Sequence, residues 1–250
     1  MKYSFPAGMR PASLEERKQF YEREFRWRKA KRWIRSFVKV DTGRHSGIVK
    51  EGKPELIMLR PERDLRERLL HYLPEDVYYD RNTYRSLNAC LHCKTFFGKI
   101  KNRYCWWVCP NAIGQELAFD VDPENASPDI RGSIYSFTEE EFEVARKTTI
   151  ELVEWLKERF GTVVPVYSGR GFHVVVKGQD GLGLEERQAL IDELPERLRE
   201  MIDPWVTRGN IRLLRLPYSL HGLVSRVVTP LKKQDLEKTD LLTRFKPEYL

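Results

Sequence analysis

The sequence predicts an α+β protein, and three observations indicate this class. The chain has 250 residues, 41% of them hydrophobic, which is enough to bury a substantial core in one large or two small domains. Apolar residues recur every three or four positions from Phe142 to Phe160, the spacing of one helix face. Shorter apolar runs at 116–122, 163–167 and 174–176 have the length of buried strands. Helices and strands are therefore both expected to contribute to the core.

Basic residues are concentrated in two segments of the chain. Residues 1–50 contain 14 Lys and Arg against 5 Asp and Glu, whereas the whole chain has a net charge of only +7. Residues 81–105 contain six further Lys and Arg and no acid, and Trp and Tyr lie within the first segment and within or directly after the second. Cations neutralise phosphates and aromatic rings stack on bases, so this composition predicts a nucleic-acid partner. A solvated helix face is the alternative for the N-terminal segment.

The sequence predicts no contact with a membrane. It contains no run of 18 apolar residues, and its first residues do not have the pattern of a signal peptide. We therefore expect a cytoplasmic protein, which its nucleic-acid partner would associate with the nucleoid.

Two helices and a strand are predicted in the first third of the chain. Ser13 and Glu16 form a capping-box pattern, so a long helix should run from this point to about Phe37. A strand is expected at 55–59 and a second helix at 61–72.

The four cysteines of the chain fall within 20 residues, as Cys90, Cys93, Cys105 and Cys109. Two close pairs on either side of a short loop are typical of a tetrahedral Zn²⁺ site, because each pair can bind two corners. Two disulfides are the alternative, but the cytoplasm would keep the thiols reduced. His92 could also replace one thiol. We expect a structural zinc-binding module at 88–112, because four protein ligands leave no position for a catalytic water.

Asp120 and Asp122 stand two residues apart at the end of an apolar run. On a strand this spacing places both carboxylates on one face. Hard divalent cations such as Mg²⁺ prefer oxygen ligands, so the pair is a candidate metal site. A strand that ends in a turn, begun by Asp122 and Pro123, is the alternative interpretation.

A helix and a glycine-containing turn follow the acidic strand. Thr138 and Glu141 form a second capping-box pattern at the start of the periodic helix. Farther on, two glycines let the backbone approach a ligand closely in one short turn, which also contains Ser168, Arg170 and His173. A hydroxyl, a guanidinium and an imidazole in one turn are suited to phosphate binding. A simple hairpin is the alternative.

Three further polar residues follow in the last third of the chain. A helix is expected at 184–202, with an interruption at Pro195. Asp203 is then a third acid, at the start of a strand, and an apolar strand carries Arg215 and is followed by His221. These last two groups, six residues apart, indicate an anion between them, although an edge strand with solvated arginines is the alternative.

Taken in order, these motifs resemble the catalytic subunit of archaeo-eukaryotic DNA primases, and most closely the archaeal small subunit. The shared pattern is acid-x-acid, a helix, Ser-Gly-Arg-Gly-Phe-His, a further acid, and Arg-Leu-Pro-Tyr-Ser-Leu-His-Gly. The resemblance extends from 9–17 to 235–237 and so covers most of the chain. Its most specific feature is the last motif, in which Asp203 precedes His221 by 18 residues.

The resemblance implies a fold, an activity and a role for each motif. The fold would be an RRM-like sheet packed with a second α/β unit, and 1–250 would form one catalytic domain. The activity would be template-directed synthesis of short primers on single-stranded DNA from NTPs or dNTPs. By this likeness two Mg²⁺ or Mn²⁺ ions would be bound by Asp120, Asp122 and Asp203. The phosphates of the incoming nucleotide would contact Ser168, Arg170, His173, Arg215 and His221.

The chain departs from this family pattern in two places. The cysteine cluster precedes the acids, whereas archaeal small subunits usually carry zinc after them. The turn at 168–173 is one residue shorter than in replicative subunits and closer to that of plasmid and viral members.

Several alternative functions therefore stay open. Besides an archaeal-type subunit with a primase large subunit as its partner, the sequence allows a plasmid- or virus-type primase-polymerase that works alone with dNTPs. A non-catalytic, zinc-containing nucleic-acid-binding subunit of a replication complex is a third possibility, and a metal-dependent nuclease is a fourth.

Overall fold

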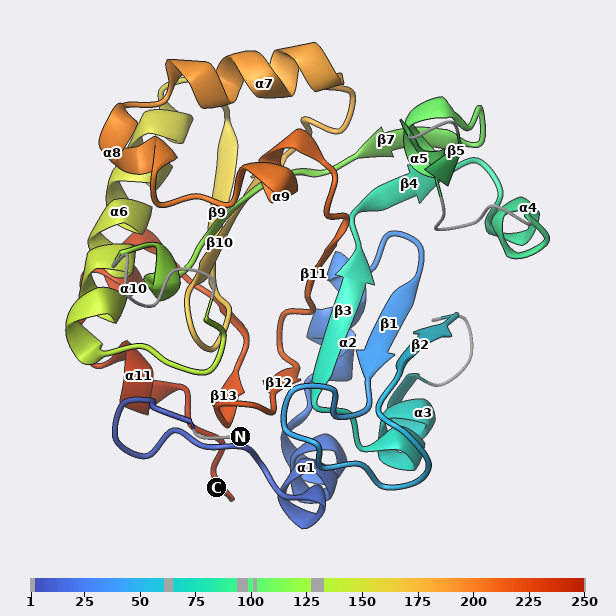
Figure 1. Ribbon diagram of the computed structural model, residues 1–250, viewed down its shortest axis with the longest axis vertical. Coiled ribbons are helices and arrows are strands. Elements are labelled where there is room, and N and C mark those ends of the chain that lie inside the picture. The colour runs from blue at the N-terminus through green and yellow to red at the C-terminus, as the bar shows by residue number, and fades with distance from the viewer. Residues whose placement is uncertain (1–2, 61–64, 94–98, 101–102, 127–132, 250) are drawn as a thin grey trace.

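Two antiparallel sheets of four strands each lie side by side in the computed structural model, which describes residues 3–60, 65–93, 99–100, 103–126 and 133–249 (Figure 1). The first sheet has the strand order β11–β3–β1–β2, and the second has the order β14–β9–β10–β8. Helices cover the outer side of the second sheet (Figure 1). This combination of helices and antiparallel strands confirms the predicted α+β class.

The strands are short. The first sheet consists of β1 (Val38–Asp41), β2 (Leu56–Leu59), β3 (Asp76–Asp80) and β11 (Leu213–Arg215), and the second consists of β8 (Leu117–Val121), β9 (Thr162–Tyr167), β10 (Phe172–Lys177) and β14 (Thr229–Pro230). Three two-stranded pairs are β4 (Asn82–Tyr84) with β7 (Ala112–Gln115), β5 (Lys99–Ile100) with β6 (Arg103–Tyr104), and β12 (Leu220–His221) with β13 (Arg226–Val227).

The helices differ widely in length. They are α1 (Leu14–Gln19), η1 (Phe20–Glu24), α2 (Trp27–Ala30), η2 (Lys31–Trp33), α3 (Leu65–Tyr72), α4 (Leu87–Leu91), α5 (Cys105–Val108), η3 (Pro123–Asn125), α6 (Glu139–Lys157), α7 (Leu184–Glu193), α8 (Glu196–Arg199), α9 (Pro204–Arg208), α10 (Lys233–Leu236) and α11 (Leu241–Arg244). The capping box of Thr138 and Glu141 starts α6, and the break at Pro195 separates α7 from α8, so both predictions are confirmed. The predicted start of α3 at residue 61 lies outside the described residues.

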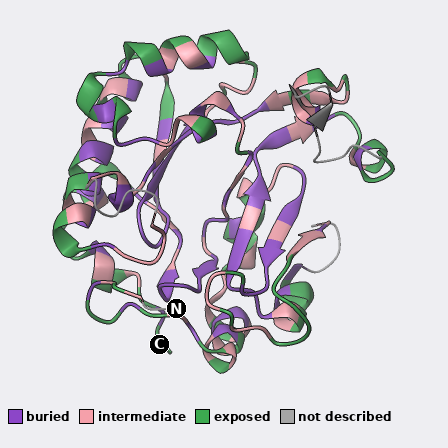
Figure 2. Cartoon of the chain, in the orientation of Figure 1, coloured by how far each residue is buried: buried purple, intermediate pink, exposed green. Residues whose placement is uncertain are grey.

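The residues of β8 divide between two cores. Leu117, Phe119 and Val121 are fully buried in the core that also contains the apolar face of α6. Ala118 belongs instead to the core of the first sheet. Successive side chains of a strand point to opposite faces, so Asp120 shares the face of Ala118 and looks toward the first sheet. Figure 2 shows the buried strands of both sheets facing each other across this region.

The prediction of one long N-terminal helix is wrong beyond the first turns. The capping box of Ser13 and Glu16 does start α1, but the helix widens to the π-helix η1 and ends at Phe25, whose backbone is extended. Phe20 and Tyr21 are almost completely buried in the core of the first sheet. Burial of these rings against the sheet outweighs the local helix propensity, which alone would continue the helix.

Two predicted boundaries near the site are also wrong. Asp203 does not start a strand: it is the N-cap of α9, and its Oδ1 accepts a hydrogen bond of 2.8 Å from the backbone N–H of Trp205. Pro204 at the first helical position favours this helix start. His173 lies in β10 rather than in the preceding turn, because the ladder with β8 and β9 already includes Phe172.

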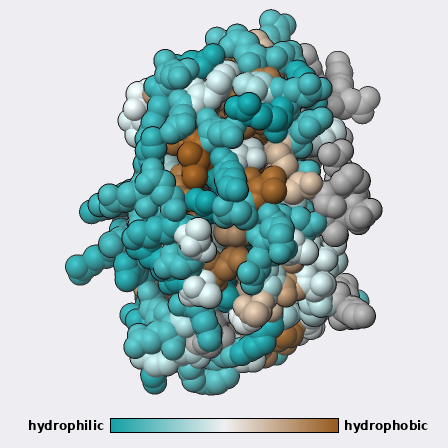
Figure 3. Space-filling view, turned by 90° about the vertical axis from the view of Figure 1, so that its left-hand side faces the viewer, coloured by the Kyte–Doolittle hydropathy of each residue, from teal (hydrophilic) through white to brown (hydrophobic). Residues whose placement is uncertain are grey.

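The outer face of the helical side is mostly hydrophilic. Figure 3 shows hydrophilic residues over most of this face, with smaller hydrophobic areas between them. Among the described residues, no helix combines the length and the apolar character that spanning a bilayer requires.

Candidate active site

Asp120 and Asp122 lie at the end of β8, where the second sheet faces the first. Asp120 pairs in register with His173 of β10, and its Oδ1 lies 3.6 Å from Nε2 of that imidazole. Gly171 approaches Asp122 so closely that an added Cβ would come within 2.7 Å of Asp122 Oδ1. The strand therefore presents both acids next to the turn that was predicted to bind phosphate.

Asp203 joins this pair through the backbone. Its N–H donates a hydrogen bond of 2.9 Å to the carbonyl oxygen of Asp120, and Ile202 forms an isolated bridge with Val121. Because one carboxylate oxygen of Asp203 caps α9, its other oxygen remains for a ligand. Three acids from two distant parts of the sequence thus meet at one end of β8.

The three acids are placed so that a bound cation would stabilise their ionised form. Burial raises the pKa of Asp120 well above its usual value, and repulsion from Asp122 and Asp203 raises it further. Burial also raises the pKa of Asp203. Oδ1 of Asp120 is buried and has no hydrogen-bond partner among the described residues. Buried carboxylates in this state are costly unless a positive charge compensates them.

The donor set suits a Mg²⁺ or Mn²⁺ ion that also takes water and substrate oxygens as ligands. It is less suited to an ion that protein side chains alone would bind. Within the described ranges, no three His, Cys, Asp or Glu side chains are grouped closely enough to hold a metal ion by themselves. Mg²⁺ usually takes one or two carboxylates and completes its shell with water and substrate phosphates. Asp120 and Asp122 are suited to that kind of binding.

The turn from Ser168 to Gly171 is tight and buried. The N–H of Ser168 donates to the carbonyl of Gly171 at 2.9 Å, and the N–H of Gly171 donates to Ser168 Oγ at 3.1 Å. Gly169 has a φ of +102°, and a Cβ there would meet Cβ of His221 at 2.7 Å. Glycine is therefore needed both for the backbone conformation and for the contact with His221.

Arg170 is bound to a carboxylate that the sequence analysis did not select. Both terminal nitrogens of Arg170 donate to Glu124, one of them at 2.9 Å, and Nη2 lies 3.6 Å from Asp122 Oδ1. The guanidinium is 3% exposed, so this pair is almost completely removed from water. Arg170 therefore fixes the segment after β8, and Glu124 neutralises much of its charge.

Arg215 and His221 are joined by Asp76, another residue that the sequence analysis did not select. Oδ1 of Asp76 lies 3.1 Å from Arg215 Nε and 2.8 Å from His221 Nδ1. Burial, followed by the charge of Arg215, lowers the pKa of His221 to about 4, so the ring is neutral at neutral pH. Burial would raise the pKa of Asp76, but its partners outweigh that effect and hold it below the usual value. Arg215 is therefore the main counter-ion of Asp76.

The four cysteines lie apart from the acids, in the region of β4, β7 and the short helices α4 and α5 (Figure 1). None of the four takes part in a disulfide, and all four residues line one cavity of about 250 Å³. Burial raises the pKa of Cys90, and the other three cysteines raise it further. A hydrogen bond from Asn111 lowers the pKa but does not outweigh these effects. The described part of this region contains no closed group of metal ligands, and 94–98 and 101–102 lie outside the described residues.

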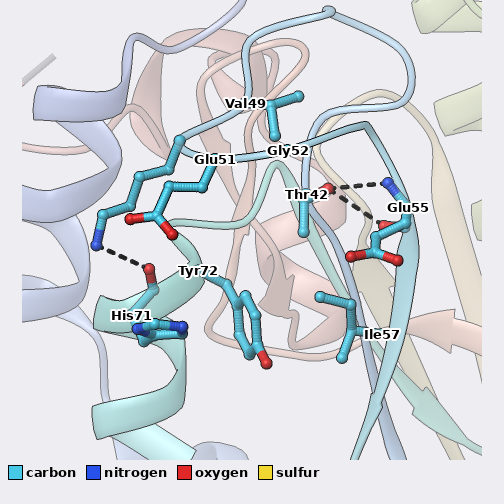
Figure 4. Close-up of a pocket in the computed structure, with 9 residues that line it drawn as sticks. Thr42, Val49, Glu51, Gly52, Glu55, Ile57, His71 and Tyr72 are labelled. Atoms are coloured by element: carbon cyan, nitrogen blue, oxygen red, sulfur yellow. Dashed lines mark hydrogen bonds between the residues drawn. The ribbon is translucent and has the colours of Figure 1, made fainter.

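A cavity of about 350 Å³ lies away from the predicted site, between the segment after β1 and the end of α3 (Figure 4). The backbone N–H of Glu55 donates to Thr42 Oγ1 at 2.9 Å, and Lys50 Nζ donates to the carbonyl of His71 at 2.9 Å. None of the predicted site residues lines this cavity. The candidate active site is thus defined by its charged groups rather than by the volume of a cavity.

Over its whole length the chain is similar to a protein of Archaeoglobus fulgidus described as an uncharacterized DNA primase small subunit-like protein. The two are 38% identical over an alignment of 272 positions, which covers all of this chain and 95% of the relative. The chain belongs to the DNA primase small subunit-like family. The DNA primase small subunit of Pyrobaculum calidifontis is 25% identical over 70% of this chain and 65% of its own length. The subunit of Pyrobaculum arsenaticum is 24% identical over 50% and 54%.

The fold of this primase small subunit-like chain also has a counterpart among solved structures. The polymerase domain of Mycobacterium tuberculosis ligase D, solved in complex with DNA, superposes with a TM-score of 0.55 over 91% of this chain and 84% of that one. The two share 11% sequence identity, so the likeness concerns the fold. No family model matches the sequence. The resemblance to primases found in the motifs is confirmed by the relatives and agrees with this fold.

Asp76 and Glu124 are thus the site residues that the motifs of this family member did not reveal. Glu124 continues the alternation of Asp120 and Asp122 by one more step, which is a signal that could have been used. Asp76 stands at the start of a strand and is fully buried, but nothing in the sequence links it to Arg215, 139 residues away.

Proposed function

We propose that this chain is the catalytic subunit of a DNA primase, a nucleotidyltransferase that copies single-stranded DNA into short primers. The observation that carries the proposal is the meeting of Asp120, Asp122 and Asp203 with Arg215 between the two sheets. Acids that attract divalent cations, next to an arginine, form the charge pattern that a bound triphosphate needs. Full-length similarity to a DNA primase small subunit-like protein supports the same activity.

The three acids would hold two Mg²⁺ or Mn²⁺ ions. Such ions stabilise charge on the attacking 3′-hydroxyl oxygen and on the leaving phosphate oxygen. Arg215, held at Nε by Asp76, turns its other N–H groups to the triphosphate and orients the leaving pyrophosphate. No side chain forms a covalent bond to the nucleotide.

The remaining residues of the site would shape the phosphate pocket. Ser168, His173 and His221 contribute polar groups from buried positions, where water competes little for the phosphates. Arg170 acts on the phosphates mainly through Asp122, because Glu124 already binds its guanidinium.

We further propose that 88–112 form a zinc-binding module within a single catalytic domain that spans 1–250. The support is the cavity lined by Cys90, Cys93, Cys105 and Cys109, since four thiols around one small space suit one structural Zn²⁺. The protein would act in the cytoplasm at the nucleoid, and a primase large subunit is a candidate partner.

The RRM-like unit of this proposal consists of β8, α6, β9 and β10. A strand, a helix and a hairpin follow one another in the chain, and β10 lies between β8 and β9 in the sheet. This is the order at the start of a β-α-β-β-α-β unit. The first sheet and its helices would be the second α/β unit.

The experiment that tests the activity is primer synthesis on single-stranded DNA by the purified chain. We expect labelled primers from the wild type, none from Asp122→Asn, and wild-type amounts from Asp192→Asn, which makes the same change at an exposed position of α7. Equal melting temperatures for the two variants would exclude a folding defect. Full activity of Asp122→Asn would contradict the metal assignment.

The same assay separates the alternatives. Products from dNTPs without any partner would favour a plasmid- or virus-type primase-polymerase. Products that require an added large subunit would favour the archaeal replicative arrangement. A folded, metal-loaded chain that binds DNA and makes no product under either condition would favour the non-catalytic binding subunit.

A further inference from the structure

A groove of about 610 Å³ lies between the two ends of the chain, outside the site described above. Arg23 and Arg26, from the basic N-terminal segment, form one side. Arg244 and Lys246, from the C-terminal segment, form the other, more than 200 residues away in the sequence. The fold thus brings the basic segment noted in the sequence together with a second pair of cations.

The charges of this groove are only partly compensated. Glu24 and Glu248 also line it, so four cations face two carboxylates. Arg244 pairs with Asp235 at 3.0 Å. Arg26 and Lys246 are exposed and have no ion-pair partner in the part of the chain that the structure describes. Arg23 is also exposed and has no ion-pair partner among those residues; its guanidinium lies 5.1 Å from the ring centre of Tyr249. An anion in the groove would therefore meet three cations that no protein carboxylate neutralises.

Aromatic rings accompany these cations. Phe25, Tyr218 and Phe245 line the groove and are half-buried. Two of these rings already lie close to cations, since Lys29 Nζ is 5.8 Å from the ring centre of Tyr218 and the Arg244 guanidinium is 5.4 Å from that of Phe245. Tyr218 has a φ of +72°, and its N–H donates to the carbonyl of Val228 at 2.6 Å. A left-handed backbone is rare for a bulky residue, and this hydrogen bond to the segment after β13 helps to hold Tyr218 in that conformation. Cations next to aromatic rings form the combination that binds single-stranded nucleic acid.

Two residues that line the groove belong to strands that pair with segments of the candidate active site. Val227 pairs in register with Leu220, the residue before His221. Thr229 pairs with Tyr167, the residue before Ser168. The strands that line the groove therefore lead directly to two residues of the predicted phosphate pocket.

We propose that this groove binds a segment of single-stranded DNA, the template strand, next to the active site. The proposal rests on the proposed primase function for the identity of the strand. The phosphates contact Arg26 and Lys246, and the bases stack on the rings that include Tyr218. The groove would hold the template by its backbone and ring faces, without reading its sequence.

The test measures binding of a fluorescent oligothymidylate to the full chain at several salt concentrations. The variant Arg26→Ala/Lys246→Ala removes two of the three unpaired cations, and the control Lys157→Ala/Arg199→Ala removes one Lys and one Arg that are exposed on α6 and α8. Each phosphate contact to a single strand contributes about 0.7 to the slope of log affinity against log salt. We expect the groove variant to flatten this slope by about 1.4 and the control to leave it unchanged.

A third variant, Tyr218→Leu, tests the rings separately. It should raise the Kd by roughly 5- to 150-fold and leave the salt slope unchanged, because stacking involves no counter-ion release. Groove and control variants with the same affinity and slope would overturn the proposal, as would a wild type that does not bind single-stranded DNA. If the groove variants lose binding while the wild type makes no primer, the result supports DNA binding in the groove and contradicts the primase function. If primers are made and the groove variants bind like the control, the result supports the primase function and contradicts DNA binding in the groove.

Discussion

Gly171 is the residue on which the geometry of the acids depends most directly. A Cβ at this position would lie 2.4 Å from the carbonyl oxygen of Val121 and 2.7 Å from Asp122 Oδ1. Gly171→Ala should therefore push the end of β8 away, abolish primer synthesis and lower the free energy of unfolding by about 1–3 kcal/mol. Gly161→Ala is the control, because a Cβ there meets nothing within 4 Å. Denaturant unfolding and the primer assay, applied to both variants, check this; an active Gly171→Ala would contradict it.

Asp76 holds Arg215 and His221 from a fully buried position. Asp76→Asn leaves the charge of Arg215 without its counter-ion, so the free energy of unfolding should fall by about 3–5 kcal/mol. The KM for the nucleotide should rise as well, since Arg215 loses its orientation. Urea unfolding and steady-state kinetics measure the two effects.

A double variant distinguishes an unpaired charge from a simple loss of packing at Asp76. Asp76→Asn/Arg215→Met removes both charges and should recover part of the lost stability, although not the activity. If the double variant were less stable than Asp76→Asn alone, the ion pair would not be the cause of the loss.

At the residue scale, the sequence allows predictions about residues that are close in the chain. Asp120 and Asp122 could be assigned to one face because strand residues alternate with a period of two. The contacts of Glu124 and Asp76 could not be predicted in this way. Glu124 meets Arg170 across 46 residues, and Asp76 meets Arg215 across 139, through contacts that only the packed fold creates.

At the element scale, α9 combines a structural and a chemical role in its N-cap, Asp203. Asparagine is as good an N-cap as aspartate, but it lacks the charge. Asp203→Asn should therefore keep the stability of the wild type and lose primer synthesis. Asp203→Ala should lose activity too, and about 1 kcal/mol of stability in addition. Thermal unfolding of both variants checks the difference; equal stabilities would show that the cap contributes nothing.

Elements with strong local signals were predicted well. The capping boxes at Ser13 and Thr138 and the break at Pro195 depend on neighbouring residues, and all three are confirmed. The predicted N-terminal helix is too long because burial of Phe20 and Tyr21 bends the chain. The helical periodicity of the sequence contains no signal for this bend. Asp203 was assigned to a strand because the apolar run after it hid the short helix α9.

At the scale of the whole molecule, the site exists because two sheets face each other. β8 and β10 carry Asp120 and His173 from one sheet, and β11 carries Arg215 from the other. The pairing of β11 with β3 joins segments more than 130 residues apart in the chain. Propensity and spacing do not determine such pairings, so the sequence revealed this arrangement only through the resemblance to primases.

The separation of the cysteine region from the two large cores leads to a prediction about metal removal. Cys90 belongs to a small third cluster with Phe37 and Tyr84, and no cysteine belongs to the cores of the two sheets. A chelator should therefore release one Zn²⁺ per chain and loosen 88–112, while α6 and both sheets keep their far-UV circular dichroism.

Thiol chemistry gives the decisive measurement for this prediction. Coordinated thiolates react slowly with a disulfide reagent, so all four cysteines should be protected before chelation. After chelation Cys93 should react first, because it is exposed, and the buried Cys90 and Cys105 should react last. Cys93→Ser should weaken zinc binding and expose the remaining thiols without a chelator. Four thiols that react at the same rates with and without chelator would mean that the shared cavity holds no metal.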